Sequence, residues 1–268
     1  MTYRPWHLGR MAALDFECSD KDPETARIVT CALIGVGGGE PAEVNRWLLN
    51  PGIPMEPGAI AVHRITNEYA AEHGMDAATG VHEIAQQVAK AVAAGTPLVG
   101  HNISFDLALL DREIRRHGQL GLEEFCEQPL TRVIDTMVID RHTAPFRRRV
   151  SESQGPYQMR TTAETYGLKW DESEAHGAEY DAMQSARVAW MMGDIAHRPA
   201  EQRPGWVQDL RDRGAKFELL AIDLETLFLR QKAWHSQWAE NYEAYLRKSK
   251  PGATVGREWP LIPFGGTP

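Results

Sequence analysis

The chain has 268 residues but only three cysteines, Cys18, Cys31 and Cys126. They form no CxxC pair and have no histidine at the spacing of a zinc ligand, which excludes the common zinc motifs. An odd number of widely spaced cysteines also argues against the disulfide framework of a small secreted domain. We therefore expect reduced thiols and a cytoplasmic protein.

Long apolar runs are absent as well. No stretch approaches the roughly 20 apolar residues that a membrane-spanning helix needs, and residues 1–7 lack the apolar core of a secretory signal. We therefore expect no membrane among the partners of this chain. What is present, with 43% hydrophobic and 25% charged residues, is the composition of an ordinary globular domain with a sizeable core.

Positive charge is scarce, and the formal net charge is −8 at pH 7. Proteins that coat nucleic acid through its phosphates are usually basic, so the acidic balance argues against a simple DNA-coating role. A site made of carboxylates remains compatible with a phosphate substrate, because cations bound at that site would meet the phosphate charge.

Three apolar segments in the first fifty residues predict strands: one ending at Phe16, one over 28–36 and one over 44–49. Their short connections favour antiparallel neighbours. Helical patterns then alternate with two short strands, at 97–100 and 133–135. A meander followed by alternating helix and strand predicts an α/β fold, with a mixed five-stranded sheet flanked by helices.

The composition changes at two proline-containing segments, 198–199 and 203–205. We therefore expect one domain over residues 1–198 and a C-terminal helical extension over residues 199–268. The extension has residues at helical spacing, which are Leu220, Leu224, Leu227, Gln231, Trp234, Trp238, Asn241 and Tyr245. This spacing predicts a long amphipathic helix. The helix either packs on its own domain or contacts a partner or a second copy, and the sequence leaves both open.

Three short fragments supply four carboxylates and one histidine. Asp15 and Glu17 end the first predicted strand, Asp106 begins a helix about ninety residues later, and His176 precedes Asp181 at the start of another helix. Residues at i and i+2 of a strand share one face. Four neighbouring carboxylates would repel each other, and two Mg²⁺ ions about 4 Å apart would relieve that repulsion. The fragments predict a two-metal phosphodiester hydrolysis centre, with His176 as general base because histidine exchanges protons near neutral pH.

The fragments read Asp-x-Glu, His-Asn-x-x-Phe-Asp and His-x-Ala-x-x-Asp-Ala. In this order they resemble the three motifs of the DEDDh family of 3′–5′ exonucleases, which has a ribonuclease H-like fold. That family includes the proofreading epsilon subunit of bacterial DNA polymerase III, ribonuclease T and oligoribonuclease. Connecting segments at 61–66, 134–137 and 163–168 are similar to the epsilon branch. The resemblance covers about residues 11–196.

The resemblance implies roles for individual residues. Asp15 would bridge two metal ions, Glu17 and Asp181 would complete the site of one ion, and Asp106 would hold the other largely through water. Cys18 and Ser19 stand where the family often has two threonines, the first of which helps to hold the 3′ end. The residues implied to lie near the terminal nucleotide are Phe16, Cys18, Ser19, His63, Asn102 and Phe105.

We therefore expect a Mg²⁺-dependent 3′–5′ exonuclease, with Mn²⁺ as a substitute, that releases nucleoside 5′-monophosphates and acts in DNA replication or repair. Single-stranded or frayed DNA is the first-choice substrate, and RNA or short oligoribonucleotides are the alternative. Two rival functions remain: a proofreading subunit that depends on a polymerase partner or a homodimer contact through the C-terminal helix, and a non-catalytic nucleic-acid-binding module on the same fold.

Other features have two interpretations each. Asp223 and Glu225 repeat the Asp-x-Glu spacing, but on a helix such residues point about 200° apart and do not share a metal. His101 fits a structural hydrogen-bonding role at a strand–helix junction, with catalysis as the alternative. The arginines at 147–149 either bind substrate phosphates or belong to a solvated loop. His63 either contacts the terminal nucleotide or has no contact with the substrate.

Overall fold

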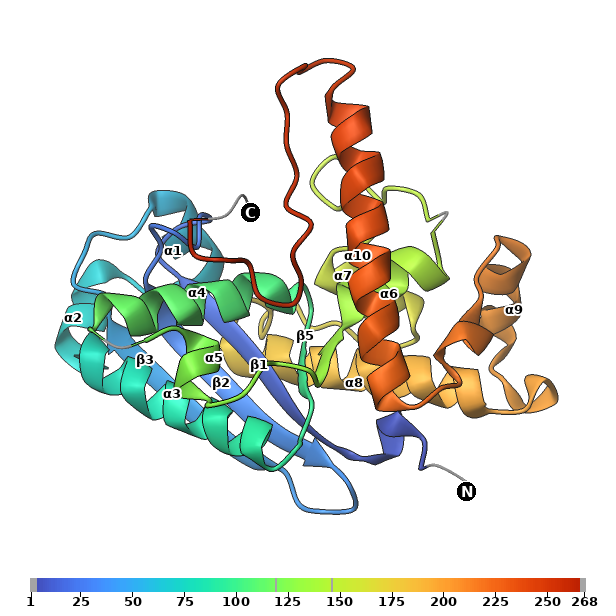
Figure 1. Cartoon of the computed structure of the whole chain (residues 1–268), viewed down its shortest axis with the longest axis horizontal. Helices are drawn as coiled ribbons and strands as arrows, with labels where there is room; N and C mark the ends of the chain where they lie inside the picture. The colour runs from blue at the N-terminus through green and yellow to red at the C-terminus, as the bar shows by residue number, and fades with distance from the viewer. Residues whose placement is uncertain (1–3, 119, 146, 266–268) are drawn as a thin grey trace.

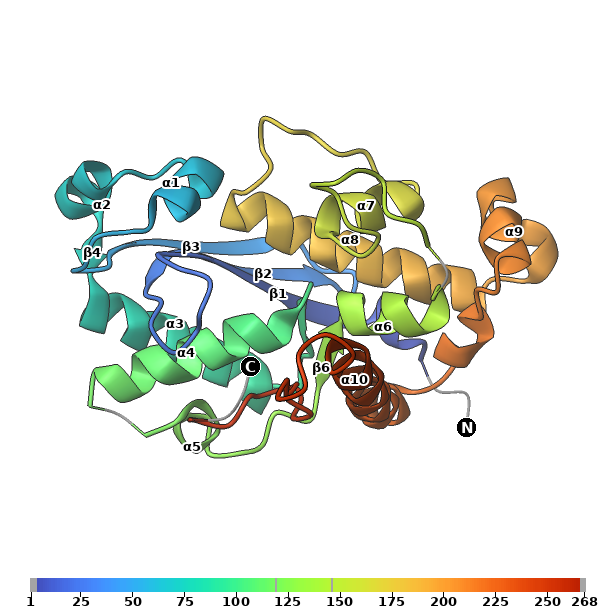
Figure 2. The same ribbon diagram turned by 90° about the horizontal axis from the view of Figure 1, so that it is seen from above.

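The computed structural model describes residues 4–118, 120–145 and 147–265, and it contains a six-stranded sheet with helices on both faces (Figures 1 and 2). The strands lie in the order β4-β3-β2-β1-β5-β6. Their bounds are β1 (Arg10–Cys18), β2 (Ile28–Gly37), β3 (Glu43–Asn50), β4 (Met75–Asp76), β5 (Leu98–Gly100) and β6 (Val133–Asp135).

The sheet is mixed, as the sequence predicts. The strands β1, β2 and β3 form the antiparallel meander, and β5 and β6 join it in parallel on the β1 side. The five predicted strands are confirmed. A sixth, β4, adds only two residues at the far edge, where it pairs in parallel with the end of β3.

Alternation along β1 decides which side chains can meet. Leu14 and Phe16 belong to the core beneath the sheet, whereas Ala13 belongs to the cluster on the opposite face. Because the period of a strand is two residues, Asp15 and Glu17 share the face of Ala13. The central strand therefore presents both carboxylates on one side of the sheet.

Each face has its own helices (Figure 2). One face packs against α3 (Ala77–Ala93) and α4 (Ile103–Arg116), with the short α5 (Leu122–Phe125) beside them. The other face packs against α8 (Ala178–His197), which is joined by α7 (Met159–Thr165). The remaining helices of the first two hundred residues are η1 (Trp6–Leu8), α1 (Pro57–His63), α2 (Asn67–His73) and α6 (Thr136–Thr143).

Small residues let α8 lie close to the sheet. Its alanines Ala178, Ala182 and Ala186 pack directly on Ala13 and Ala32 of the central strands. This close packing brings the first turn of α8 next to the end of β1. Within the described parts of the chain, none of the helices combines the length and the apolar character that crossing a membrane would require.

The last part of the chain is helical, as expected, and packs on the sheet edge. It contains η2 (Ala200–Gln202), α9 (Gly205–Asp212), η3 (Phe217–Leu220) and α10 (Leu224–Leu246). Asp223 is the N-cap of α10, where its side chain accepts a hydrogen bond from the Thr226 amide, so the repeated Asp-x-Glu spacing here serves helix capping.

A single glutamine attaches α10 to the strand at the sheet edge. Gln231 is completely buried, and its Oε1 accepts a 2.7 Å hydrogen bond from the Asp135 amide. Its Nε2 donates a 2.9 Å bond to the Val133 carbonyl. The chain after α10 then turns back, buries Trp259 and places the carbonyls of Ile262 and Pro263 on the Arg112 guanidinium.

Candidate active site

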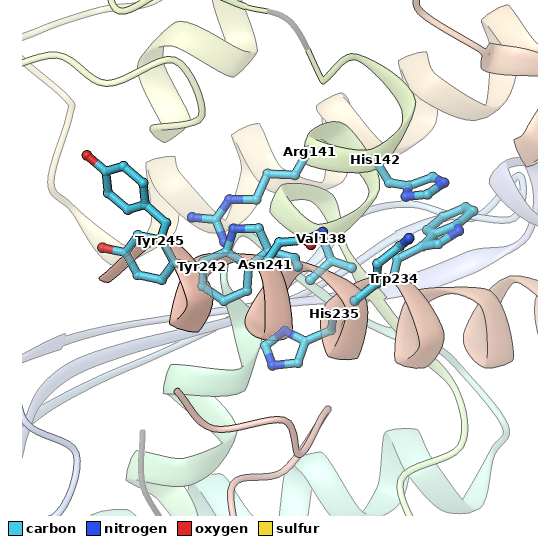
Figure 3. Close-up of a pocket in the computed structure, with 10 residues that line it drawn as sticks. Val138, Arg141, His142, Trp234, His235, Asn241, Tyr242 and Tyr245 are labelled. Atoms are coloured by element: carbon cyan, nitrogen blue, oxygen red, sulfur yellow. The ribbon is translucent and has the colours of Figure 1, made fainter. Parts of the chain in front are cut away.

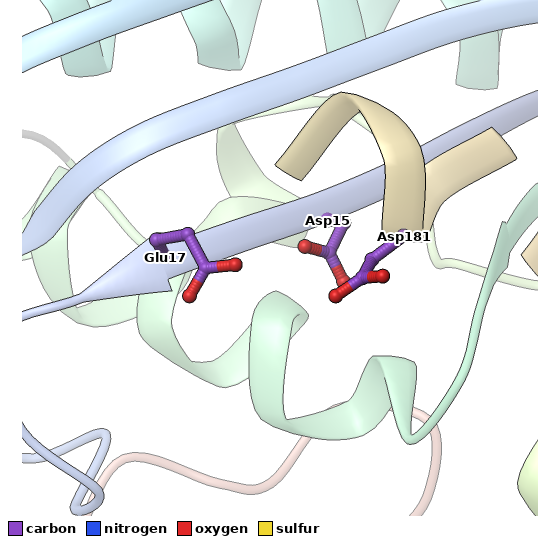
Figure 4. A group of neighbouring side chains, drawn as sticks. All are labelled: Asp15, Glu17 and Asp181. Atoms are coloured by element: carbon purple, nitrogen blue, oxygen red, sulfur yellow. The ribbon is translucent and has the colours of Figure 1, made fainter. Parts of the chain in front are cut away.

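Three carboxylates from two elements converge at the end of β1. Asp15 and Glu17 project from β1 toward the first turn of α8, which carries Asp181 (Figure 4). One oxygen from each of these three residues lies within 4.8 Å of the other two. The sequence predicts this meeting from the strand alternation of Asp15 and Glu17 and from the position of Asp181 in its motif.

The fourth predicted carboxylate, that of Asp106, lies beside this group and is held by a backbone hydrogen bond. Asp106 stands in the first turn of α4 and is buried. Its Oδ1 accepts a 3.1 Å hydrogen bond from the backbone amide of Phe16, the residue between the two carboxylates of β1. The structure therefore brings all four predicted acidic residues to one place, with Asp106 outside the closest trio.

The protonation of these groups reflects how crowded they are. Burial raises the pKa of Glu17 to about 8, with added repulsion from Asp181 and Asp106. Burial likewise raises the pKa of Asp106 to about 8. Burial, followed by the charges of three acidic neighbours, raises the pKa of Asp15 well above its ordinary value. Four negative charges are therefore not stable together here without a positive charge between them.

The donor set fits a hard divalent cation. All the converging ligand atoms are carboxylate oxygens, which Mg²⁺ and similar ions prefer. Oδ1 of Asp181 is buried and, among the described residues, has no hydrogen-bond partner. A buried carboxylate oxygen without a donor is costly, and a cation at this point would satisfy it.

His176 lies in the loop immediately before α8. It has a left-handed backbone conformation, with φ of 63°, which non-glycine residues seldom adopt. Together with Asp181 it lines a cavity of about 650 Å³. Burial raises the pKa of Asp181 to about 6, against the opposing effects of the His176 side chain and backbone amide. The predicted base and the third carboxylate of the trio therefore face the same space.

The first of the two interpretations of His101 agrees with the structure. Its Nδ1 lies 2.8 Å from the Thr136 hydroxyl, and its Nε2 lies 2.8 Å from the carbonyl oxygen of Tyr157. Both ring nitrogens are thus occupied by contacts within the protein. Burial lowers the pKa of His101 to about 4. This histidine holds the loop containing Tyr157 against the junction of β5 and α4.

The residues implied to contact the terminal nucleotide separate into two groups. Cys18, His63 and Phe105 line a cavity of about 510 Å³ together with Glu17. Nε2 of His63 is buried and lacks a hydrogen-bond partner among the described residues, whereas its Nδ1 accepts a bond from the Ile65 amide.

The other three of these residues do not line that cavity. The ring of Phe16 packs in the core, and the Ser19 hydroxyl is buried, where it accepts a hydrogen bond from the Arg27 amide. Asn102 adopts a left-handed conformation, with φ of 69°, and lines a neighbouring cavity that also includes Phe105. Contacts of Phe16 or Ser19 with a substrate in this structure would come from their backbone.

The arginine run divides between the two interpretations. Arg147 is almost buried, forms an ion pair with the buried Asp140 and stacks over the ring of Tyr157. Arg148 and Arg149 are exposed. The first arginine of the run is therefore engaged inside the protein, and the other two lie in a solvated loop.

Sequence reasoning missed most of the residues that line the cavity with His176 and Asp181, and four of those missed are arginines or large aromatic residues. They are Arg141, Tyr157, Arg160 and Trp170. Arg141 comes from α6, a helix that the sequence analysis did not predict. The signal was present, because Asp135 caps this helix by accepting from the amides of Met137 and Val138.

The fold and site define an α/β domain with a cluster of carboxylates, suited to a cation, at the end of its central strand. Residues 12–189 match the model of a family described as exonuclease. The chain is 26% identical over 182 residues to the DNA polymerase III subunit epsilon of Pasteurella multocida, covering 65% of this chain and 64% of that protein. It is 24% identical over 156 residues to the PolC-type DNA polymerase III of Lacticaseibacillus paracasei, covering 58% of this chain and 9% of that protein.

Solved structures show the same fold. A structure of E. coli exonuclease I in complex with a dT13 oligonucleotide has a TM-score of 0.57 and 17% identity, over 69% of this chain and 41% of that one. Another structure of exonuclease I covers 80% of this chain and 46% of that one, with a TM-score of 0.57. The chain therefore spans less than two thirds of the length of these relatives. It belongs to the exonuclease family, as its motifs predict.

Proposed function

We propose that this protein is a metal-dependent 3′–5′ exonuclease that removes nucleotides from DNA as nucleoside 5′-monophosphates. The observation that carries the proposal is the convergence of Asp15, Glu17 and Asp181 within 4.8 Å. Asp106 beside them and His176 in the adjoining cavity complete the residue set for phosphodiester hydrolysis. Membership of the exonuclease family supports the same reaction.

In the proposed mechanism, the carboxylates of Asp15, Glu17, Asp106 and Asp181 would hold two divalent cations, with Mg²⁺ as first choice and Mn²⁺ as a substitute. When bound, such ions stabilise the attacking and leaving oxygens of an in-line phosphoryl displacement. His176 takes a proton from the attacking water, and its loop position in front of α8 lets it face that water. The hydrogen bond of Asp106 to the Phe16 amide fixes α4 to β1 at this point.

The terminal nucleotide would occupy the cavity lined by Cys18, His63 and Phe105. Phe105 offers a ring face for the base, and the buried Nε2 of His63 lacks a partner within the described residues. DNA is the first-choice polymer because a structure of a fold relative holds dT13 and because both sequence relatives are DNA polymerase III proteins. RNA is the alternative polymer.

We assign the exonuclease domain to residues 1–198 and a separate role to residues 199–268. The family match, which ends at residue 189, supports this division. The sequence relatives also support a second candidate function, a proofreading subunit that works with a polymerase partner. A measurement of mass in solution, alone and with a polymerase, distinguishes it from an enzyme that works alone.

The test is digestion of 5′-labelled single-stranded DNA and RNA oligomers of equal sequence with Mg²⁺, Mn²⁺ or a chelator. Asp15→Asn is the matched control, because it keeps the shape of the side chain and removes its charge. A descending ladder that requires metal and is absent from the control is the expected result. An oligomer blocked at its 3′ end should resist. A ladder that persists in Asp15→Asn, or immediate release of the labelled 5′-terminal nucleotide without a ladder, would overturn the proposal.

A further inference from the structure

The second half of α10 carries aromatic rings that its own domain leaves partly uncovered. Tyr242 is 41% exposed and Tyr245 is 64% exposed. The rings of Trp238 and Tyr242 are nearly parallel, with centroids 5.3 Å apart and planes at 15°. The rings of Tyr242 and Tyr245 are also nearly parallel, with centroids 6.3 Å apart and planes at 14°. This part of α10 projects away from the sheet (Figure 1).

These rings border a groove of about 360 Å³ between α10 and α6 (Figure 3). We call it the aromatic groove, and its lining residues are Val138, Arg141, His142, Trp234, His235, Gln237, Trp238, Asn241, Tyr242 and Tyr245. Of the described residues that line it, none is acidic, although the whole chain has a net charge of −8. The groove is therefore one surface on which a polyanion would meet no carboxylate.

The groove contains one arginine side chain, that of Arg141, whose positive charge forms no ion pair within the described residues. The guanidinium of Arg141 lies 4.4 Å from the centroid of the Trp238 ring. Over residues 4–118, 120–145 and 147–265, Arg141 forms neither an ion pair nor a hydrogen bond. Asp135 attracts this guanidinium without forming an ion pair with it, so a half-buried positive charge remains that is suited to receive a phosphate from outside.

The aromatic groove and the cavity of the candidate active site share a lining residue. Arg141 lines both the groove and the cavity that contains His176 and Asp181. Trp238 and Tyr242 also line a cavity of about 570 Å³ together with Phe105 and Asn102. The rings of α10 and the residues beside the carboxylates therefore border neighbouring cavities with shared walls.

We propose that the aromatic groove binds the single-stranded nucleic acid that precedes the 3′-terminal nucleotide. Bases stack on the rings of Trp238, Tyr242 and Tyr245, and Arg141 holds a phosphate at the exit from the active site. Stacking on aromatic rings is tolerant of sequence, as an exonuclease requires. The seven helical steps from Trp238 to Tyr245 rise about 10 Å, which is room for roughly three stacked nucleotides. The proposal rests on the proposed function, because the strand has to end at the carboxylates.

The test is binding of fluorescent dT3, dT12 and rU12 by fluorescence anisotropy, with Mg²⁺, in the Asp15→Asn background so that the probe is not consumed. The quantity compared is the gain in affinity from dT3 to dT12. In Tyr242→Ala/Tyr245→Ala this gain should fall at least about tenfold, since each stacked base contributes that order of affinity. Arg141→Met should reduce it as well. Tyr245→Phe, which keeps the ring face, should retain it.

Two controls match the variants in kind and in position. Leu229→Ala removes a 59% exposed apolar side chain from the same helix outside the groove. Tyr69→Ala removes a 48% exposed tyrosine from α2. Both should keep the length dependence of the parent. If the double variant fails to fold by circular dichroism, Tyr245→Ala replaces it, because this ring is the most exposed of the three.

An unchanged gain from dT3 to dT12 in the tyrosine variants would overturn the proposal. So would an equal loss for dT3 and dT12, which would indicate a general disturbance of the site. A change in mass in solution with unchanged oligomer binding would also overturn it and would assign the groove to protein association. Comparison of dT12 with rU12 identifies the polymer. Because binding is measured without turnover, failure of the aromatic groove is distinguishable from failure of the exonuclease reaction.

Discussion

The backbone amide of Phe16 donates a hydrogen bond to Oδ1 of Asp106, although the two residues are 90 positions apart in the chain. The bond fixes the strand that carries Asp15 and Glu17 to the helix that carries Asp106. The second motif therefore has a structural function in addition to the chemistry that we propose for it. The two functions can be separated by substitution.

Asp106→Asn should keep the fold and lose the reaction. The asparagine oxygen can still accept the bond from Phe16, but the negative charge for cation binding is lost. Because a bound cation contributes several kcal/mol to the transition state, we expect turnover to fall about 10³-fold. Asp106→Ala should lose turnover and also about 1–3 kcal/mol of unfolding free energy, because the buried Phe16 amide is left unpaired. Urea unfolding of both variants checks this, and equal stability would contradict it.

His176→Asn should lower kcat about 10²- to 10⁴-fold, the usual contribution of a general base. Asparagine tolerates the left-handed conformation that residue 176 adopts, so the stability of the fold should change little. Cation affinity, measured by calorimetry, should stay within about twofold of that of the parent. Retained turnover at neutral pH would remove His176 from the mechanism and leave the carboxylate site intact.

The metal-free protein should become less stable as pH rises from 6.5 to 8. Glu17 and Asp106, each with a pKa near 8 in the folded protein, keep protons that the unfolded chain has already released. The stability that they contribute is complete at low pH and is lost as pH rises through about 8. Burial lowers the pKa values of His7 and His101 to about 4, so these two groups change the stability with pH only below about 6.5, the ordinary pKa of histidine. The pH range for this prediction therefore begins at 6.5.

The check is the melting temperature in chelator at several pH values between 6.5 and 8. Mg²⁺ should reduce the decrease of melting temperature with pH, because it binds the deprotonated carboxylates. Glu17→Gln removes one titrating group and should also reduce it. A melting temperature that rises with pH in chelator would contradict the raised pKa values.

Arg147→Met should destabilise the fold, whereas Arg149→Ala should not. Asp140 is completely buried and accepts hydrogen bonds from Thr162 and Tyr166 in addition to its ion pair with Arg147. Removing one partner of a buried pair costs about 3–5 kcal/mol, and an exposed substitution usually changes stability by less than about 0.5 kcal/mol. Unfolding in urea measures both. Full stability of Arg147→Met with weakened oligonucleotide binding would instead assign Arg147 to substrate phosphates.

Much of the fold could be predicted because its strands have a local signal. The apolar segments that became β1, β2 and β3 are long, and their short connections impose an antiparallel order. The seven-residue helix α1 was not predicted, because Pro51, Pro54 and Pro57 favour a loop up to its first residue. The two residues of β4 pair only through their position beside β3, for which no local pattern exists.

The candidate site shows the same division. The carboxylates were predictable because alternation along a strand and position at a helix start are local properties. The ion pair of Arg147 with Asp140 depends on how separate segments pack, so the arginine run remained ambiguous. The spacing of Trp238 and Tyr245 predicted a helix, but only the packing of α10 on α6 determines which rings stay uncovered.

The hydrogen bonds of Gln231 to Val133 and Asp135 have a consequence for self-association. An open strand edge is a template on which a second chain can add a strand, which is how many native proteins aggregate. At β6 the glutamine amide occupies a donor and an acceptor of that edge, so strand addition is blocked on this side of the sheet. The helix α10 thus protects the molecule against edge-to-edge polymerisation, whatever else its outer face binds.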